Sequence, residues 1–159
     1  ETASLLGGVS GAVAGLVGVT PAAGFVGPMG AIAIGVAAGL ACMWFVVVMK
    51  SRMRIDDSLD VFGIHGVGGI VGAILTGVFA APALGGSGVF DYSTGSVAVF
   101  DMGRQVGVQA LGVAICVVWS TLVSFAAIHL VRATIGLRVD TNDERQGLDL
   151  TSHGENAYN

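Results

Sequence analysis

Four long apolar segments constrain the fold of this chain more than any other feature. They lie at about Leu5–Val19, Gly30–Met49, Asp60–Ala81 and Val106–Val131. Only 11% of the 159 residues are charged, whereas a typical soluble protein contains about 25%. About 20 apolar residues cross a hydrocarbon core of about 30 Å, so the first segment is too short unless it extends at its start. The sequence therefore predicts an all-α integral membrane protein with about four transmembrane helices; a soluble helical bundle is the weaker alternative.

The distribution of basic residues predicts how these helices are oriented. Short loops rich in Lys and Arg stay on the cytoplasmic side of a membrane. Only Arg104, beside the long loop Pro82–Gly103, lies on one side, and the other six basic residues follow the second or the fourth segment: Lys50, Arg52, Arg54, Arg132, Arg138 and Arg145. We therefore expect both termini in the cytoplasm and the loop Pro82–Gly103 outside. Residues 1–137 would form the membrane domain, and the acidic, polar residues 138–159 a cytoplasmic tail.

The third segment begins with acidic residues, reading DDSLD from Asp56 to Asp60. Carboxylates are favourable at the start of a helix, where they accept hydrogen bonds from free backbone N–H groups and interact with the helix dipole. Asp57 and Asp60 are three residues apart and fall on one face. Capping and loop scaffolding is the favoured interpretation of this pair, and direct contact with a substrate is the alternative.

A single histidine lies among the apolar and glycine residues that follow. His65 comes one turn after Val61, and Gly68 and Gly72 form a Gly-x-x-x-Gly step suited to close helix packing. Apolar surroundings favour a neutral imidazole, which carries one hydrogen-bond donor and one acceptor and can pass a proton. An ionisable residue at membrane depth indicates a functional site. A structural histidine bonded to a backbone carbonyl is an equally weighted interpretation.

The first segment presents two faces of different character. Glycines recur every fourth residue from Gly7 to Gly15, a pattern typical of close helix packing. Ser10, Val13 and Thr20 fall at three- to four-residue steps, counting Val17 between the last two, on another face. That face could line a passage, although an ordinary packing face is more common.

Three groups of motifs stand out along the chain: GLVGVTPA from Gly15 to Ala22, DDSLDVFGIHGVGG from Asp56 to Gly69, and the pieces GLRV, ERQGLD and SHGENAY between Gly136 and Tyr158. Together they resemble the ammonium transporter (Amt/Mep/Rh) family. The motifs run in family order along nearly the whole chain, and the last group is similar to the tail of the bacterial Amt branch.

This resemblance implies an eleven-helix inverted-repeat transporter fold that assembles as a homotrimer, with a pore in each subunit. The chain matches the C-terminal portion, the last four helices and the tail. It also opens at Glu1 without an initiating Met or a basic leader, which suggests a fragment. The missing upstream part would supply the external ammonium site and a second pore histidine.

The resemblance also implies roles for individual residues. His65 matches one of two hydrogen-bonded pore histidines. Val61 and Val13 match positions that narrow the apolar pore, and Thr20 and Ser10 match polar positions near its ends.

The implied function is transport of ammonium or ammonia across the bacterial inner membrane by a multi-pass protein. Asp57 would be the cytoplasmic counterpart of the acidic residue near the external site, with Asp60 beside it. A PII-type signalling protein would bind the cytoplasmic face.

We expect no cofactor, metal or nucleic acid, and no enzymatic activity, because no nucleophile–base pair or metal cluster is present. The alternative is a non-conducting structural or regulatory membrane fragment.

Overall fold

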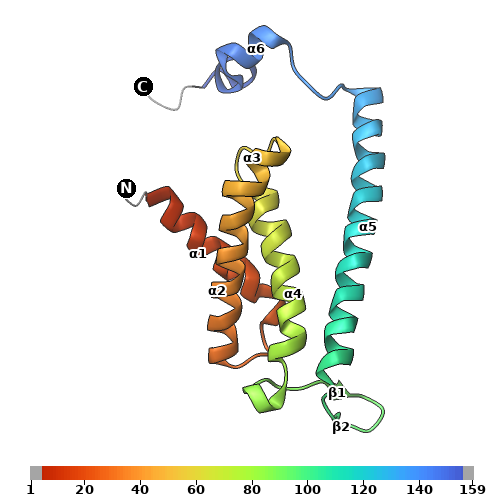
Figure 1. Cartoon of the computed structure of the whole chain (residues 1–159). Coiled ribbons are helices and arrows are strands. Elements are labelled where there is room, and N and C mark those ends of the chain that lie inside the picture. Colours follow the sequence, from red (N-terminus) through yellow and green to blue (C-terminus); the bar gives the residue numbers. More distant parts are fainter. Residues whose placement is uncertain (1–4, 156–159) are drawn as a thin grey trace. The chain divides into compact units, whose positions relative to one another are not determined.

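The computed structural model describes residues 5–155, which are mostly helical (Figure 1). Within this described part, four helices are long and apolar enough to cross a membrane: Leu5–Ala22, Pro28–Met53, Phe62–Phe79 and Met102–Thr134, with 18, 26, 18 and 33 residues. They correspond in order to the four apolar segments of the sequence, which confirms the predicted all-α membrane fold. By its internal contacts the chain divides into two units, one ending at Ile115 and the other beginning at Cys116.

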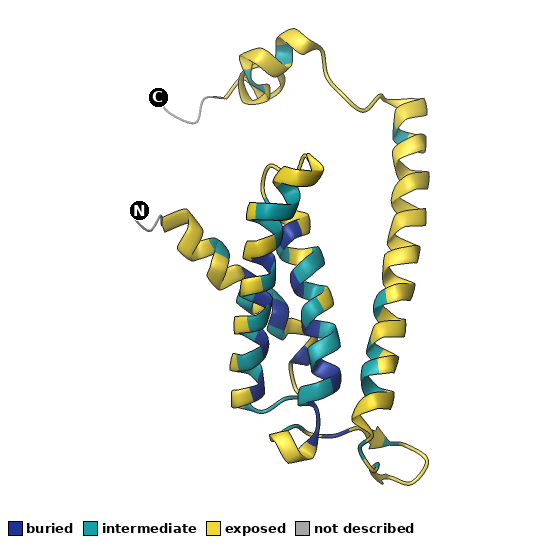
Figure 2. Cartoon of the chain, in the orientation of Figure 1, coloured by how far each residue is buried: buried dark blue, intermediate teal, exposed yellow. Residues whose placement is uncertain are grey.

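The centre of the first unit is a group of three helices, α1 (Leu5–Val19), α2 (Pro28–Trp44) and α4 (Val67–Phe79). Each packs against the other two; α1 crosses α2 obliquely, and α4 runs beside α2 (Figure 1). The buried positions, dark blue where the helices meet in Figure 2, are mostly small residues, among them Ala14, Gly18, Ala38, Gly68 and Gly72. Small side chains let helix backbones approach closely, which is the main source of packing energy in lipid.

The first helix ends where the sequence predicts. α1 stops at Val19, and Thr20–Ala22 form a 3-10 turn that contains Pro21. Proline disfavours the α conformation in the residue before it, which accounts for the change of helix type. The turn adds length at the end of the helix. The predicted extension at its start falls on residues 1–4, outside the described residues.

The second helix runs further than predicted. α2 continues through a π-helical turn, Phe45–Met49, into α3 (Lys50–Met53), and ends where Arg54 adopts a left-handed conformation with φ 53°. The prediction stopped at Met49 because the apolar run stops there. Backbone hydrogen bonds do not require apolar side chains, and long basic side chains can extend from a helix end toward water.

The third helix is shorter at both ends than predicted. It begins with a π-helical turn, Phe62–Gly66, because Asp60 has a left-handed φ of 55° and cannot belong to the helix. It ends at Phe79, because Ala81 precedes Pro82 and is extended, with φ −59° and ψ 128°.

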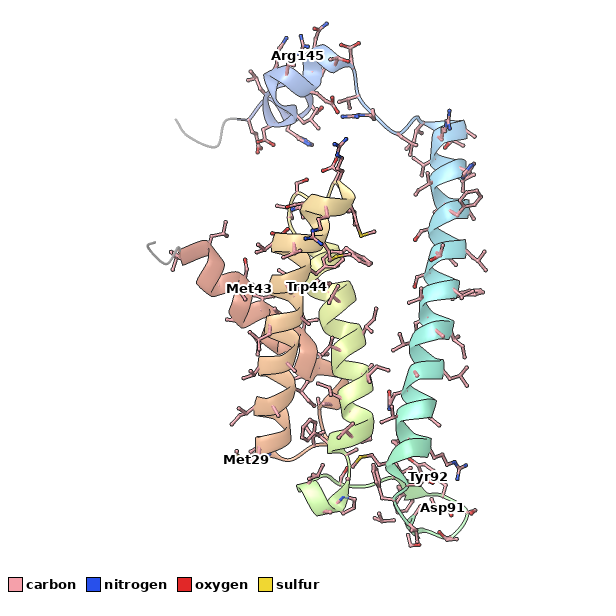
Figure 3. All side chains as sticks on the ribbon, viewed as in Figure 1. Met29, Met43, Trp44, Asp91, Tyr92 and Arg145 are labelled. Atoms are coloured by element: carbon pink, nitrogen blue, oxygen red, sulfur yellow. The ribbon has the colours of Figure 1, made fainter. Side chains whose placement is uncertain are left out.

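The loop after α4 contains structure that the sequence did not predict. A 3-10 turn, Pro82–Leu84, is followed by an antiparallel hairpin of β1 (Phe90–Asp91) and β2 (Ser96–Val97). Figure 3 shows Asp91 and Tyr92 on this hairpin. The loop also contacts the α1–α2 connection, since the Ser87 N–H donates to the Phe25 carbonyl at 2.9 Å.

The last membrane helix, α5 (Met102–Thr134), begins before the predicted Val106 and ends after Val131. Asp101 accepts a hydrogen bond from the Arg104 N–H at 3.0 Å at its start, so polar residues extend the helix beyond its apolar part.

The second unit contains a short helix, α6 (Thr141–Gln146), and a π-helical turn, Asp149–His153. Asp140 caps α6 by accepting from the Asn142 N–H at 2.8 Å. The described tail is largely exposed, as its acidic composition predicts.

Candidate functional site

His65 lies in the first turn of the third membrane helix, within the π-helical segment Phe62–Gly66. Its side chain is exposed, and its ring has no hydrogen-bond partner among residues 5–155. Val61, one turn earlier, is 53% exposed. Of the two interpretations of His65, a ring bonded to a backbone carbonyl is therefore not the one seen in the described part of the chain.

The face of α4 that continues from His65 packs against α1. A Cβ atom at Gly68 would lie 3.4 Å from Val17 Cγ1 and 3.6 Å from the Ala14 carbonyl oxygen, and one at Gly72 would overlap the Gly18 carbonyl. The predicted Gly-x-x-x-Gly packing step is confirmed. His65 precedes Gly68 by three residues, so it lies beside the α1–α4 contact.

The predicted residues of the first membrane helix, Leu5–Ala22, have different environments. Ser10 is half-buried, whereas Val13 is 36% exposed and Thr20 is exposed. The Thr20 hydroxyl donates to the Leu16 carbonyl at 2.8 Å, so its hydrogen is already used within the helix. Its oxygen keeps acceptor capacity toward a molecule outside the helix.

Asp57 caps the start of the third helix. Its Oδ1 accepts from the Val61 N–H at 2.8 Å, and its Oδ2 accepts from the Gly63 N–H at 3.1 Å. These are two of the backbone donors that a helix start leaves without an intrahelical partner. The capping interpretation therefore agrees with the geometry of this carboxylate.

Asp60 makes a different contact, to a residue that the sequence interpretation used only for its charge. Lys50 Nζ lies 2.6 Å from Asp60 Oδ1 and also donates to the Asp57 backbone carbonyl. Lys50 and Asp60 are partly buried, with side chains 25% and 30% exposed. The signal in the sequence was a lone lysine at the end of an apolar run, ten residues before a carboxylate.

Two of the predicted residues, Ser10 and Asp60, line one groove. It has a volume of about 620 Å³ and is mostly apolar, with Gly39, Met43 and Ile64 also on its walls. Val13, Thr20, Val61 and His65 are not among the residues that line it.

A second recess contains polar residues that the sequence interpretation missed. It has a volume of about 280 Å³, and Thr76, Gln105 and Gln109 line it together with Tyr92 of the hairpin. The Thr76 hydroxyl donates to the Gly72 carbonyl at 2.8 Å. Among the described residues no group of three or more His, Cys, Asp or Glu side chains could hold a metal ion.

Known relatives match this chain over nearly all of its length. An ammonium transporter from Bacillus subtilis is 41% identical over 155 residues, which cover 98% of this chain and 37% of the relative. An ammonium transporter from Aquifex aeolicus is 44% identical over 156 residues, covering 98% and 35%. The chain thus spans about a third of the length of the curated relatives it matches.

Solved structures agree in fold. Saccharomyces cerevisiae Mep2 is similar with a TM-score of 0.66 and 38% identity, covering 82% of this chain and 29% of that protein. A Mep2 mutant from Candida albicans gives a TM-score of 0.65 and 34% identity, covering 94% and 32%. The model of the Ammonium Transporter Family matches residues 2–158. This chain belongs to the ammonium transporter family.

Proposed function

We propose that this chain contributes the last four membrane helices of an ammonium transporter subunit, in which ammonia passes along a route lined by the first and third of these helices. The observation that carries this proposal is the family match, which runs through both helices and through His65. The relatives' names supply the substrate, ammonium. The packing of α4 on α1 next to His65 supports the choice of these two helices.

The chemistry of the route follows from the cost of moving a charge through an apolar space. An unpaired ammonium ion would lose hydration worth on the order of tens of kcal/mol in a low-dielectric medium. Ammonium therefore gives up a proton before the narrow region, and ammonia crosses. In this proposal Val61 and Val13 narrow the route and exclude water, and Thr20 and Ser10 offer polar contacts near its ends.

His65 would be the polar group inside the apolar part of the route. A neutral imidazole can accept a hydrogen bond from ammonia at one nitrogen and donate at the other, and it can relay a proton. Both ring nitrogens are without a partner among residues 5–155, which leaves them for the substrate and for a second histidine from outside this chain. Asp57 and Asp60 act in this proposal at the cytoplasmic start of the same helix.

Assembly and regulation are part of the same proposal. The subunits would form a homotrimer in the bacterial inner membrane, with residues 138–159 in the cytoplasm as a docking site for a PII-type signalling protein. The Arg138–Glu144 ion pair, at 2.7 Å, and the capped helix α6 give the tail a local structure that a partner could recognise. Native mass spectrometry of the purified full-length protein in detergent would test the trimer through the mass of the complex.

A non-conducting membrane fragment is the second candidate function. The observation in its favour is that Val61, His65 and Thr20 are exposed within the described chain rather than enclosed by it. Liposomes that contain the 159-residue chain alone, compared with liposomes that contain the full-length gene product, distinguish the two. Uptake with the full-length protein alone would mean that this chain conducts only as part of the larger subunit.

The experiment that tests the transport role of His65 compares two histidine substitutions. In the full-length protein, His65→Ala should abolish or alter ammonium-coupled current on a solid-supported membrane, because the imidazole in the route is lost. His129→Ala is the control. Its ring lies on α5, with Nδ1 2.9 Å from the Phe125 carbonyl, and has no assigned part in transport. Normal current in both variants would refute the role of His65.

A further inference from the structure

We propose that Lys50 is a positioning residue for transport: its ammonium group fixes the start of the helix that carries His65. The role in transport rests on the proposed function, and the positioning itself rests on two contacts of the Lys50 ammonium group. We call the contacts of Lys50 with Asp57 and Asp60 the Lys50 clamp.

The Lys50 clamp joins two helices across a segment that has no regular structure. Lys50 lies in the last turns of the long helix Pro28–Met53, and both of its partners precede the third membrane helix. Nζ lies 2.6 Å from Asp60 Oδ1 and donates a second hydrogen bond to the Asp57 carbonyl. The ammonium therefore holds a side chain and the backbone of this segment at the same time.

The surroundings make this contact stronger than an ordinary surface ion pair. Exposed pairs contribute little, because water screens them and two long side chains must be ordered. Here the side chains of Lys50 and Asp60 are only 25% and 30% exposed, and hydrogen bonds between charged groups are stronger than neutral ones. A substitution that removes one partner would leave the other charge partly buried and unpaired.

The clamped residues are the ones that begin the helix of His65. The Asp57 carboxylate accepts from the N–H groups of Val61 and Gly63, and the Asp60 carbonyl accepts from the Ile64 N–H at 2.8 Å. Ile64 directly precedes His65. A shift of Asp57 and Asp60 would therefore move the first turn, and the imidazole with it.

Apolar contacts also hold the turn Phe62–Gly66 against the long helix, but they do not determine its position along that helix. The rings of Phe45 and Phe62 lie 5.4 Å apart, and a Cβ at Gly63 would meet the Val46 side chain at 2.6 Å. Such contacts press the turn against the long helix without fixing where along it the turn begins. Directional hydrogen bonds from Lys50 supply that constraint, because their energy falls steeply as geometry departs from the optimum.

The test uses the full-length gene product in liposomes and variants matched at position 50. Lys50→Met keeps the length and removes the charge, and Lys50→Arg keeps the charge. Arg52→Met is the control on the same helix, because Arg52 is exposed and its side chain has no hydrogen bond or ion pair within residues 5–155. We expect Lys50→Met to lower the maximal uptake rate about tenfold to a hundredfold with little change in KM, the size of effect that a small misplacement of a reacting group produces. Lys50→Arg should retain most of the rate, and Arg52→Met should behave as the unmodified protein.

A second measurement distinguishes a displaced His65 ring from a general loss of stability, and it does not depend on the proposed transport function. Solid-state NMR of ¹⁵N-histidine protein, with the His65 signal assigned by comparison with His65→Asn, reports the ring environment whether or not the protein transports ammonium. We expect the His65 ring nitrogens to shift in Lys50→Met and to remain in place in Arg52→Met. Unchanged ring signals in folded Lys50→Met would overturn the proposal. Absence of uptake in the unmodified protein would instead overturn the proposed function and leave the NMR comparison valid.

If Lys50→Met does not fold, the exchanged pair Lys50→Asp with Asp60→Lys provides the test. This double variant restores opposite charges at the two positions. Recovery of folding together with the original His65 signals supports the clamp as the positioning device. Recovery of folding with shifted His65 ring signals would overturn the proposal, because an ion pair between positions 50 and 60 would then not suffice to position the His65 ring.

Discussion

Asp91 shows at the residue scale how a short polar turn perturbs a single carboxyl group. In the hairpin the Ser93 hydroxyl donates to Asp91 Oδ1 at 2.6 Å and the Ser93 N–H donates to it at 2.8 Å. Hydrogen bonds from Ser93 to the ionised form hold the pKa of Asp91 below its ordinary value. The unfolded chain lacks these donors, so folding favours the ionised form. The stabilisation is therefore present above the unfolded pKa of about 3.9 and is lost as the pH falls through the lower folded pKa.

Removal of the Ser93 hydroxyl should move this titration upward. In Ser93→Ala the pKa of Asp91 is expected to rise toward its ordinary value, because the hydroxyl donor is lost while the backbone N–H of residue 93 remains. The measurement is a ¹³C NMR titration of the Asp91 carboxyl group. Ser96→Ala is the matched control, since the Ser96 hydroxyl contacts Thr94 and not Asp91. Identical midpoints in the unmodified protein and in Ser93→Ala would show that the hydroxyl does not stabilise the carboxylate.

The cap made by Asp57 could be predicted from the residue pattern, whereas the contacts of Lys50 could not. An aspartate before an apolar run indicates a cap, and Asp57 does cap the third helix. The contacts of Lys50 with Asp57 and Asp60 were missed, because they require the long helix to continue past Met49 and the chain then to turn back. The sequence predicts that His65 and Val61 lie near the start of the third membrane helix, where the structure has them. Their role in transport comes from the family resemblance and stays a prediction.

At the scale of elements, the crossing of α1 and α4 depends on two glycines in contact. A Cβ at Gly72 would overlap the Gly18 carbonyl group, which belongs to rigid backbone and cannot swing away. On the same helix a Cβ at Gly69 would meet nothing within 4 Å. The two positions therefore have the same helix propensity, but only position 72 has no space for a side chain.

Alanine substitutions at these two positions should have opposite effects on stability. Gly72→Ala should lower the free energy of unfolding by about 1–3 kcal/mol, the usual cost of overpacking, or prevent assembly. Gly69→Ala should leave it unchanged or raise it by up to about 1 kcal/mol, because alanine has the higher helix propensity. Unfolding in mixed micelles of increasing SDS content measures both. Equal stability of the two variants would contradict the close α1–α4 crossing.

The element boundaries show which parts of the fold local chemistry determines. The stops at Val19 and before Ala81 follow from the prolines that come next, so the sequence predicts them to within two residues. The extension to Met53 and the longer α5 were missed because the prediction followed hydropathy, whereas helices continue wherever backbone hydrogen bonds and caps allow. The hairpin was missed because its strands are only two residues long.

At the scale of the whole molecule, the predicted orientation remains to be tested. Two connections, the α1–α2 turn and the loop after α4, meet through the Ser87–Phe25 hydrogen bond, so they belong to the same end of this three-helix group. Lys50, Arg52 and Arg54 lie at the opposite ends of α2 and α4. The positive-inside rule then predicts that the basic end lies in the cytoplasm and the hairpin outside.

Single cysteines in a cysteine-free background of the full-length protein test this orientation. Ser58→Cys lies at the basic end, and Val99→Cys lies between β2 and α5, where Val99 is 99% exposed. A membrane-impermeant maleimide added to intact cells should label Val99→Cys, and it should label Ser58→Cys only after the cells are permeabilised. Thr151→Cys in the tail should behave as Ser58→Cys does. If Ser58→Cys reacts in intact cells while Val99→Cys does not, the chain is inverted, and the tail could not meet a cytoplasmic signalling protein. Labelling of Thr151→Cys with Val99→Cys would instead mean that α5 does not cross the membrane.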